Sequence, residues 1–178
     1  MLNSLGTERD RVLVQLGIAT GFRISELLSL RLTDIIAYDD VKGSITVERK
    51  HTKGKAQSRS IPVSKALQSV LQAYVSSLPK NQVWLFKGKY KAPLSRSQAW
   101  RNIKQAARKN KLEGKIATHS LRKSFAARVY KNSNKDLVVT KELMGHKNVN
   151  STLSYLSFTK EELYKSVLGI GLEHDNAT

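Results

Sequence analysis

The sequence predicts an α+β fold that is mostly α-helical, with a small antiparallel three-stranded sheet near the N-terminal part. Apolar residues recur at helical spacing in several segments, whereas residues 31–63 hold short β-prone runs separated by polar turns. The 178 residues suffice for one domain with a proper core, and no internal repeat or clear linker divides them. We therefore expect a single domain over residues 1–170 and a disordered tail over residues 171–178.

The first two helices are predicted from the signals at their ends. Thr7 can cap a helix over residues 7–19, whose first turn carries acidic residues where the helix dipole favours them. Gly21 ends this helix, and residues 24–30 continue as a second, short helix.

The sheet is predicted from three short β-prone runs, over residues 35–36, 44–48 and 58–63. The turn between the last two runs, H-T-K-G-K-A-Q, is polar, contains glycine and is heavily basic. Pro62 closes the last strand, and Ser64 caps a helix with a strong apolar stripe.

The rest of the chain predicts a loop over residues 78–93, anchored by Trp84, Leu85 and Phe86, and a series of helices. Thr118 is the expected cap of the longest of these helices, and Gly145 is the expected C-terminal residue of another. The helices from Ser64 onward are expected over about residues 64–75, 95–110, 119–130, 136–144, 150–156 and 159–168.

The charge of the chain favours a polyanionic partner. Lysine and arginine outnumber aspartate and glutamate by 31 to 14, which gives a formal charge of +17 and a pI near 10.2. Nucleic acid is the leading candidate, because contacts of lysine and arginine with phosphates release counterions. A generally soluble basic surface is the alternative, and an anionic membrane is less favoured because no amphipathic polybasic helix stands out.

Several classes of protein are excluded or disfavoured. The chain has no cysteine, which excludes disulfides, zinc ribbons and thiol nucleophiles. Its start lacks the features of a secretory signal, and no apolar stretch approaches the roughly 18–20 residues that cross a bilayer. We therefore expect a soluble, cytoplasmic protein without a membrane partner.

Two arginines have the setting of anion-binding residues. His119 and Arg122 project from one face of a helix near its N-terminus, where backbone N–H groups already favour an anion. Arg23 follows a helix junction, and Glu26 on the next turn can orient its guanidinium for bidentate recognition of a phosphate. The alternatives are a packed histidine with a surface arginine, and an ordinary intrahelical ion pair.

A lysine and a tyrosine complete the candidate chemistry. Lys53 lies in the basic turn, where cationic neighbours favour proton donation, although Lys50 and Lys55 beside it are equally able to contact phosphate or solvent. Tyr155 follows His146 by nine residues, and nearby arginines would favour its phenolate form. A half-buried core tyrosine with a structural histidine is the alternative.

An oxygen nucleophile that faces cations suits phosphoryl transfer, in which the enzyme positions the phosphate and neutralises its charge. No acidic cluster in the sequence suggests a magnesium site, so we expect no metal and no cofactor, with side-chain cations neutralising the charge.

Five motifs in order resemble the catalytic domain of the tyrosine recombinases, the phage-integrase family. They are T-G-F-R-I-S-E-L-L-S-L, T-K-G-K with R-S-I-P-V, H-S-L-R-K-S-F-A, L-M-G-H and S-T-L-S-Y, and the resemblance covers about residues 8–168. It implies that the single domain over residues 1–170 is a catalytic domain with that family's fold.

The resemblance also implies a role for each candidate residue. Arg23 and Arg122 would hold the scissile phosphate, with Glu26 supporting Arg23. Tyr155 would attack, forming a 3′-phosphotyrosyl enzyme and a free 5′-hydroxyl without ATP. The remaining implied roles concern proton transfer and hydrogen bonding: Lys53 as the acid for the leaving 5′-hydroxyl, with Lys55 as the alternative, His119 assisting at the tyrosine, and His146 bonding the phosphate.

Partners follow from the same resemblance. Double-stranded DNA would be the substrate, with no small-molecule substrate, and the protein would assemble on DNA as a tetramer in the nucleoid. The helix over residues 159–168 would dock on a neighbouring protomer or fold back in cis, and we expect the family's N-terminal core-binding domain to be absent from this chain. A type IB topoisomerase-like nicking-closing enzyme and a catalytically silent DNA-binding relic are the alternatives.

Basic residues concentrate in residues 42–59 and 87–115, and we expect these runs to flank DNA, with the helix over residues 95–110 entering the major groove. The candidate DNA-contacting residues are Lys50, Lys55, Arg59, Ser95, Arg96, Ser97 and Arg101.

Overall fold

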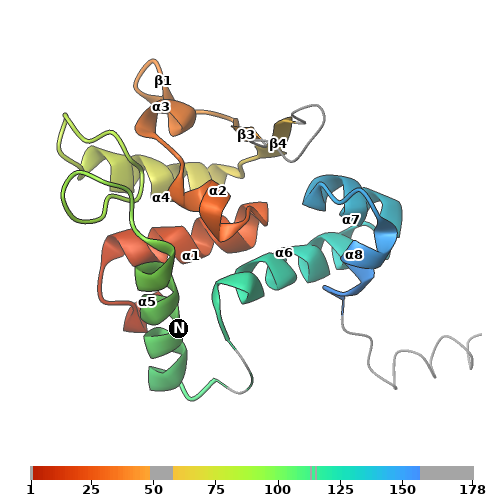
Figure 1. The fold of residues 1–178 in the computed structure, drawn as a ribbon. Helices are drawn as coiled ribbons and strands as arrows, with labels where there is room; N and C mark the ends of the chain where they lie inside the picture. The colour runs from red at the N-terminus through yellow and green to blue at the C-terminus, as the bar shows by residue number, and fades with distance from the viewer. Residues whose placement is uncertain (1, 49–57, 113, 115, 157–178) are drawn as a thin grey trace, which may run out of the picture.

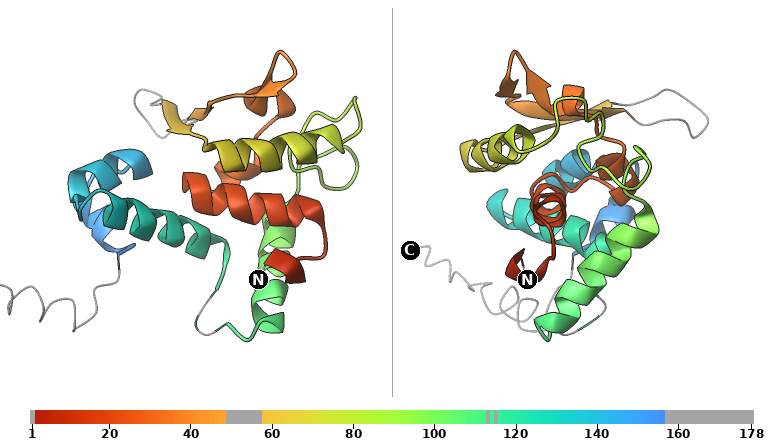
Figure 2. Two further views of the ribbon diagram at one scale, coloured as in Figure 1. Left: turned by 180° about the vertical axis from the view of Figure 1, so that it is seen from behind. Right: turned by 90° about the vertical axis from the view of Figure 1, so that its left-hand side faces the viewer.

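The computed structural model describes residues 2–48, 58–112, 114 and 116–156 of the chain. Its centre is helix α1 (Glu8–Thr20), which packs along α4 (Lys65–Ser76) on one side and along α5 (Arg96–Lys109) and α6 (Thr118–Asn132) on the other (Figure 1; Figure 2). Helices α7 (Leu137–Met144) and α8 (Val149–Leu153) lie at the far end of α6 (Figure 1). The remaining short helices are η1 (Leu2–Ser4), α2 (Ile24–Leu28) and α3 (Leu32–Ile35).

The prediction of a mostly helical fold with small antiparallel pairing is confirmed, but the predicted three-stranded sheet is wrong in the described residues. Strand β3 (Ser44–Glu48) pairs with β4 (Ser58–Pro62), while β1 (Ile36–Ala37) pairs with β2 (Asp40–Val41) in a separate antiparallel hairpin. The turn between β1 and β2 consists of Tyr38 and Asp39, whose φ angles of 51° and 67° match the twist of a tight hairpin. This run therefore finds its partner locally.

Side-chain caps account for most helix starts. The hydroxyls of Thr7 and Ser64 accept hydrogen bonds from the backbone N–H groups three residues later, as the sequence predicts. The predicted cap at Thr118 is wrong, because Thr118 is already helical and Ala117 precedes the helix. There, Ser120 accepts a hydrogen bond from the N–H of Ala117 at 3.1 Å.

Other boundaries differ by a few residues. Helix α2 ends at Leu28 and α8 covers Val149–Leu153, so both are shorter than predicted. The helix predicted over residues 159–168 and the tail after it lie outside the described residues. None of the helices in the described ranges combines the length and apolar character that crossing a membrane requires.

One large apolar core joins the central helices to the sheet and to α7. Leu16, Ile45 and Met144, from three distant parts of the chain, are each 0% exposed within it. The predicted anchors of the loop before α5 behave differently from one another: Leu85 and Phe86 are fully buried, whereas Trp84 is half-buried beneath the guanidinium of Arg31. The core therefore fixes the ends of α1, α6 and α7, which carry the candidate site.

Candidate active site

The α1–α2 junction presents Arg23. Gly21 ends α1 in the left-handed conformation with φ 60°, and a Cβ at this position would overlap the ring of Phe125 on α6. Two residues later, the guanidinium of Arg23 pairs with Glu26 Oε1 at 3.0 Å, and the Arg23 backbone N–H donates to Glu26 Oε2 at 2.6 Å. The side chain of Arg23 stays 40% exposed. Glu26 thus orients an arginine that still faces solvent.

Arg122 is held in the protein interior by backbone carbonyls. It comes from the first half of α6 and is 1% exposed. Its Nη1 donates to the carbonyl of Gly21, and its Nη2 donates to the carbonyl of Met144 at 2.5 Å. Burial, and then the charge of Arg23, lower the pKa of Arg122, but an arginine remains a cation in proteins. This guanidinium therefore joins the ends of α1 and α7.

His146 follows the glycine that ends α7. Gly145 has φ 60°, as expected for the left-handed residue after a helix, and turns the chain toward α6. His146 Nε2 lies 3.0 Å from Arg122 Nη2, and its Nδ1 lies 3.0 Å from the hydroxyl of Thr152. Arginine only donates, so a neutral ring that carries its proton on Nδ1 fits both contacts, with Nε2 accepting from Arg122 and Nδ1 donating to Thr152.

The ring of Tyr155 lies close to both His119 and His146. Its ring centroid is 4.8 Å from that of His119 and 5.3 Å from that of His146, and the guanidinium carbon of Arg122 lies 5.8 Å from the ring. The turn after α8 holds it, since the Tyr155 N–H donates to the carbonyl of Thr152 at 2.9 Å. A phenol, two imidazoles and a buried guanidinium thus meet within one molecule.

The electrostatics of this group favour a neutral His119. Partial burial is the largest cause that lowers the pKa of His119, followed by the charges of Arg122, Lys123 and Arg23. A neutral imidazole can accept a proton, which suits a base beside a phenol.

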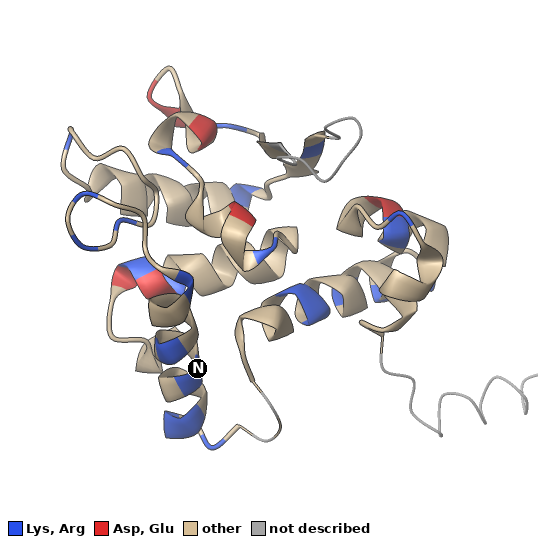
Figure 3. Ribbon diagram, in the orientation of Figure 1, with Lys and Arg blue, Asp and Glu red and all other residues tan. Residues whose placement is uncertain are grey.

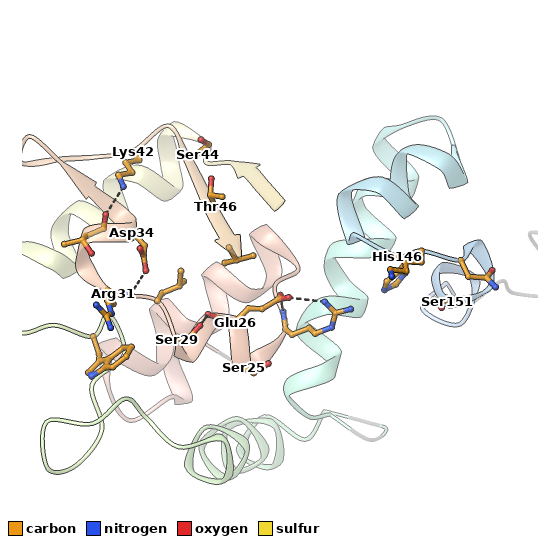
Figure 4. Close-up of a pocket in the computed structure, with 17 residues that line it drawn as sticks. Ser25, Glu26, Ser29, Arg31, Asp34, Lys42, Ser44, Thr46, His146 and Ser151 are labelled. Carbon is orange, nitrogen blue, oxygen red and sulfur yellow. Dashed lines mark hydrogen bonds and ion pairs between the residues drawn. The ribbon is translucent and has the colours of Figure 1, made fainter. Parts of the chain in front are cut away.

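An open cleft of about 1270 Å³ extends from His146 across the α1–α2 side. Figure 4 shows Glu26 near its middle, His146 and Ser151 at one end, and Arg31 and Lys42 toward the other. Hydroxyl groups and cations dominate its lining, which suits a chain of phosphates. Among the described residues, no group of three or more histidine, cysteine, aspartate or glutamate side chains is placed to hold a metal ion.

Arg59 is placed differently from its prediction as a DNA-contacting residue. Its side chain is 11% exposed, pairs with Glu26 at 3.2 Å, and donates to the carbonyls of Leu143 and Met144 at 3.1 and 2.8 Å. A guanidinium with these partners is poorly available to a phosphate, so the structure does not support that prediction. The sequence holds a signal for this placement, because Arg59 shares the inward face of β4 with buried Ile61.

The other predicted DNA-contacting residues are on α5 or outside the described residues. Arg96, Ser97 and Arg101 are exposed on α5, and the hydroxyl of Ser95 caps this helix by accepting from the N–H of Gln98. The basic-turn residues lie outside the described part of the chain; they are Lys50, Lys53 and Lys55.

Comparisons with known proteins identify the family of the chain. A family model described as the phage integrase family matches residues 2–162. The tyrosine recombinase XerD of Staphylococcus aureus is 32% identical over 170 residues, which cover 92% of this chain and 55% of XerD. The chain therefore spans about half the length of the curated relatives that it matches.

Two solved structures share the fold. A crystal structure of XerA recombinase matches with a TM-score of 0.75 at 22% identity and covers 94% of this chain and 59% of XerA. The XerH site-specific recombinase, bound to palindromic difH substrate in a post-cleavage complex, matches with a TM-score of 0.73 at 24% identity and covers 93% of this chain and 49% of XerH.

Proposed function

The chain belongs to the phage integrase family, and from this premise we propose that it is the catalytic domain of a site-specific tyrosine recombinase that cleaves and rejoins duplex DNA. The observation that carries the proposal is the position of Tyr155 close to His119, His146 and buried Arg122. A tyrosine that only packs in the core does not require imidazole and guanidinium neighbours. A nucleophile does, because it needs a base and a cation beside the phosphate that it attacks.

In the proposed reaction, the phenolic oxygen of Tyr155 attacks the phosphorus of the scissile phosphodiester. The bond from phosphorus to the 5′-oxygen breaks, the phenolic proton passes to His119, and Lys53 gives a proton to the leaving 5′-oxygen. A 3′-phosphotyrosyl bond replaces the phosphodiester bond, so the 5′-hydroxyl of another strand can reverse the reaction without ATP.

The arginines supply the charge that this step requires. Arg23 is exposed, and its guanidinium is oriented by Glu26, so it can reach a phosphate from the cleft. Arg122 Nε is buried and has no hydrogen-bond partner among the described residues, and a phosphate oxygen is the acceptor that we assign to it. We also assign His146 to this phosphate as a donor through Nε2, which requires a protonated Nε2 that exchanges Arg122 for a phosphate oxygen.

The DNA path in this proposal follows the cleft and α5. Figure 3 shows lysine and arginine repeated along α5, and the whole chain carries a formal charge of +17. The relative XerH is described as bound to its difH substrate, which supports DNA as the partner here. The proposed contacts are Lys50, Lys55, Ser95, Arg96, Ser97 and Arg101. Assembly as a tetramer on DNA, in the bacterial nucleoid, belongs to the same proposal.

The test uses covalent capture. The chain is incubated with a pool of nicked duplexes of randomised sequence, and SDS-stable protein–DNA adducts are isolated and sequenced. We expect adducts with the wild type, none with Tyr155→Phe, and wild-type yield with the control Tyr38→Phe, whose ring lies on an exposed hairpin turn. Equal yields from wild type and Tyr155→Phe would contradict the nucleophile assignment.

The same assay separates the alternatives. A shared sequence in the captured duplexes supports a site-specific recombinase. Adducts without sequence preference, together with relaxation of supercoiled plasmid, support a topoisomerase-like enzyme. DNA binding by the wild type without any adduct supports a catalytically silent DNA-binding protein.

A further inference from the structure

Arg59 is a largely buried cation that has no role in the proposed reaction. It lies on β4, yet within the described residues its guanidinium forms hydrogen bonds with Glu26 on α2 and with the last carbonyls of α7. Its guanidinium also stacks over Phe22, at 4.9 Å from the ring centroid, in the segment between α1 and α2. These contacts connect β4 to both α2 and α7.

Two partners of Arg59, Glu26 and the carbonyl of Met144, are shared with arginines of the candidate site. Glu26 gives one carboxylate oxygen to the guanidinium of Arg23, while its other oxygen pairs with Arg59. The carbonyl of Met144 accepts from Arg59 at 2.8 Å and from Arg122 at 2.5 Å. Arg59 thus shares one hydrogen-bond acceptor with each of the two arginines that are proposed to bind the phosphate.

The fork of the guanidinium is what makes this arrangement possible. Nη2 reaches the carboxylate of Glu26, while Nη1 reaches the last carbonyls of α7, just before Gly145 and His146. A lysine ammonium carries the same charge on a flexible stem, but it lacks the rigid, planar set of donors that holds two groups at a fixed angle.

We propose that Arg59 is a positioning residue, which holds Arg23 and the turn that carries His146 at a fixed separation so that both can meet one phosphate. It contacts neither the DNA nor the reacting atoms. The inference rests on the proposed function, because it assigns Arg59 to the phosphoryl-transfer step. Misplacing reacting groups by about 1 Å can slow a step about 100-fold, so a loss of this kind is expected in rate rather than in binding.

The decisive variant is Arg59→Lys, which keeps the charge beside Glu26 and so should fold; Arg59→Gln is the second variant. Arg9→Lys is the matched control, because Arg9 also pairs with a carboxylate, Asp10, and donates to a carbonyl, that of Lys87, away from the site. Three quantities are measured for each variant. With a captured duplex, these are the rate of adduct formation at saturating DNA and the DNA dissociation constant; the third is the midpoint of thermal unfolding.

We expect Arg59→Lys to slow adduct formation by about 10- to 100-fold while the dissociation constant changes less than about threefold. Arg9→Lys should lower the midpoint of thermal unfolding about as much as Arg59→Lys does, but it should leave the rate of adduct formation unchanged. Glu26→Gln should reduce the rate of adduct formation by a smaller factor in the Arg59→Lys background than in the wild type, since the two residues act as a unit. A wild-type rate in Arg59→Lys, or a rate loss matched by an equal loss of DNA affinity, overturns the inference.

Amide hydrogen exchange tests the same inference without catalysis. In Arg59→Lys, the amides of Arg23, Gly145 and His146 should exchange faster than in Arg9→Lys, because their acceptors lie in the segments that Arg59 joins. Unchanged exchange at these amides overturns the positioning role even if the wild type forms no adduct. Missing adduct in the wild type alone counts against the proposed function.

Discussion

The two sides of the candidate site are built differently. On the α1–α2 side, Arg23 keeps 40% of its side chain exposed and, within the described part of the chain, bonds only Glu26 through its side chain. On the α6–α8 side, Arg122 is 1% exposed and donates to two backbone carbonyls. Two arginines proposed for the same phosphate therefore have opposite environments.

This difference in burial predicts that the two sides contribute differently to the stability of the fold. An exposed ion pair contributes little to stability, whereas a buried charge that loses its bonds is costly. The α6–α8 side is consequently part of what holds the fold together, and the α1–α2 side can be altered with little effect on folding. Substitutions on the two sides should therefore be told apart by stability before any activity is measured.

The largest expected effect is that of Arg122→Leu. It leaves the carbonyls of Gly21 and Met144 buried without their donor and should lower the free energy of unfolding by about 3–5 kcal/mol. Arg23→Leu should cost less than about 1 kcal/mol, because the pair is partly exposed and Glu26 keeps its pairing with Arg59. Urea denaturation measures both, and equal losses would remove the distinction between the two sides.

Gly21 belongs to both sides, since it ends α1 before Arg23 and gives its carbonyl to Arg122. Gly21→Ala places a Cβ at φ 60° and against the ring of Phe125, and should cost about 2–4 kcal/mol. The double variant with Phe125→Leu should recover part of this loss in thermal unfolding. If the double variant recovers nothing, the clash is not the cause.

Thr152→Val tests how the α6–α8 side orients His146. It removes the hydroxyl that faces Nδ1 and should slow adduct formation several-fold, with a stability loss of about 1 kcal/mol. Thr140→Val is the control, because Thr140 is equally buried and its hydroxyl donates to the carbonyl of Asp136. The control should lose similar stability and keep its rate; slowing by both variants would show that the rate merely follows stability.

The smallest effect concerns pH. The pKa of His119 is lowered from 6.5, so its neutral form persists to a lower pH in the folded protein than in the unfolded chain. As the pH falls below about 6.5, the unfolded chain binds the proton before the folded protein does. This group therefore lowers the stability of the folded protein below that pH and has no effect on stability above it. NMR titration should give a His119 pKa below 6.5, and Lys123→Gln should raise it slightly by removing one cation. A value at or above 6.5 in the wild type contradicts the proposed electrostatics.

The sequence predicted local features well. The caps at Thr7 and Ser64 and the helix-ending glycines Gly21 and Gly145 depend on a few neighbouring residues, and the structure confirms them. The spacing of His119 and Arg122 and the motif around Tyr155 pointed to groups that the structure brings together. Their chemical roles stay predictions.

What the sequence could not give are contacts between distant segments. Arg59 finds its partners 33, 84 and 85 positions away, so its run of basic neighbours suggested DNA instead. The burial of Arg122 depends on the carbonyls of Gly21 and Met144, which no side-chain pattern reveals. The three-stranded sheet failed because a tight turn paired β1 with β2 locally.

The carbonyl of Met144 accepts from two arginines, and it is a backbone atom. An alanine scan leaves this acceptor in place at every position, so the scan would record residue 144 only as a core methionine. Exchanging its side chain for another apolar one would leave this acceptor in place, whereas changing the length of α7 would move it. Inserting or deleting one residue between Asp136 and Gly145 would rotate the carbonyl away from both guanidinium groups, and should harm the site more than any single substitution in that helix.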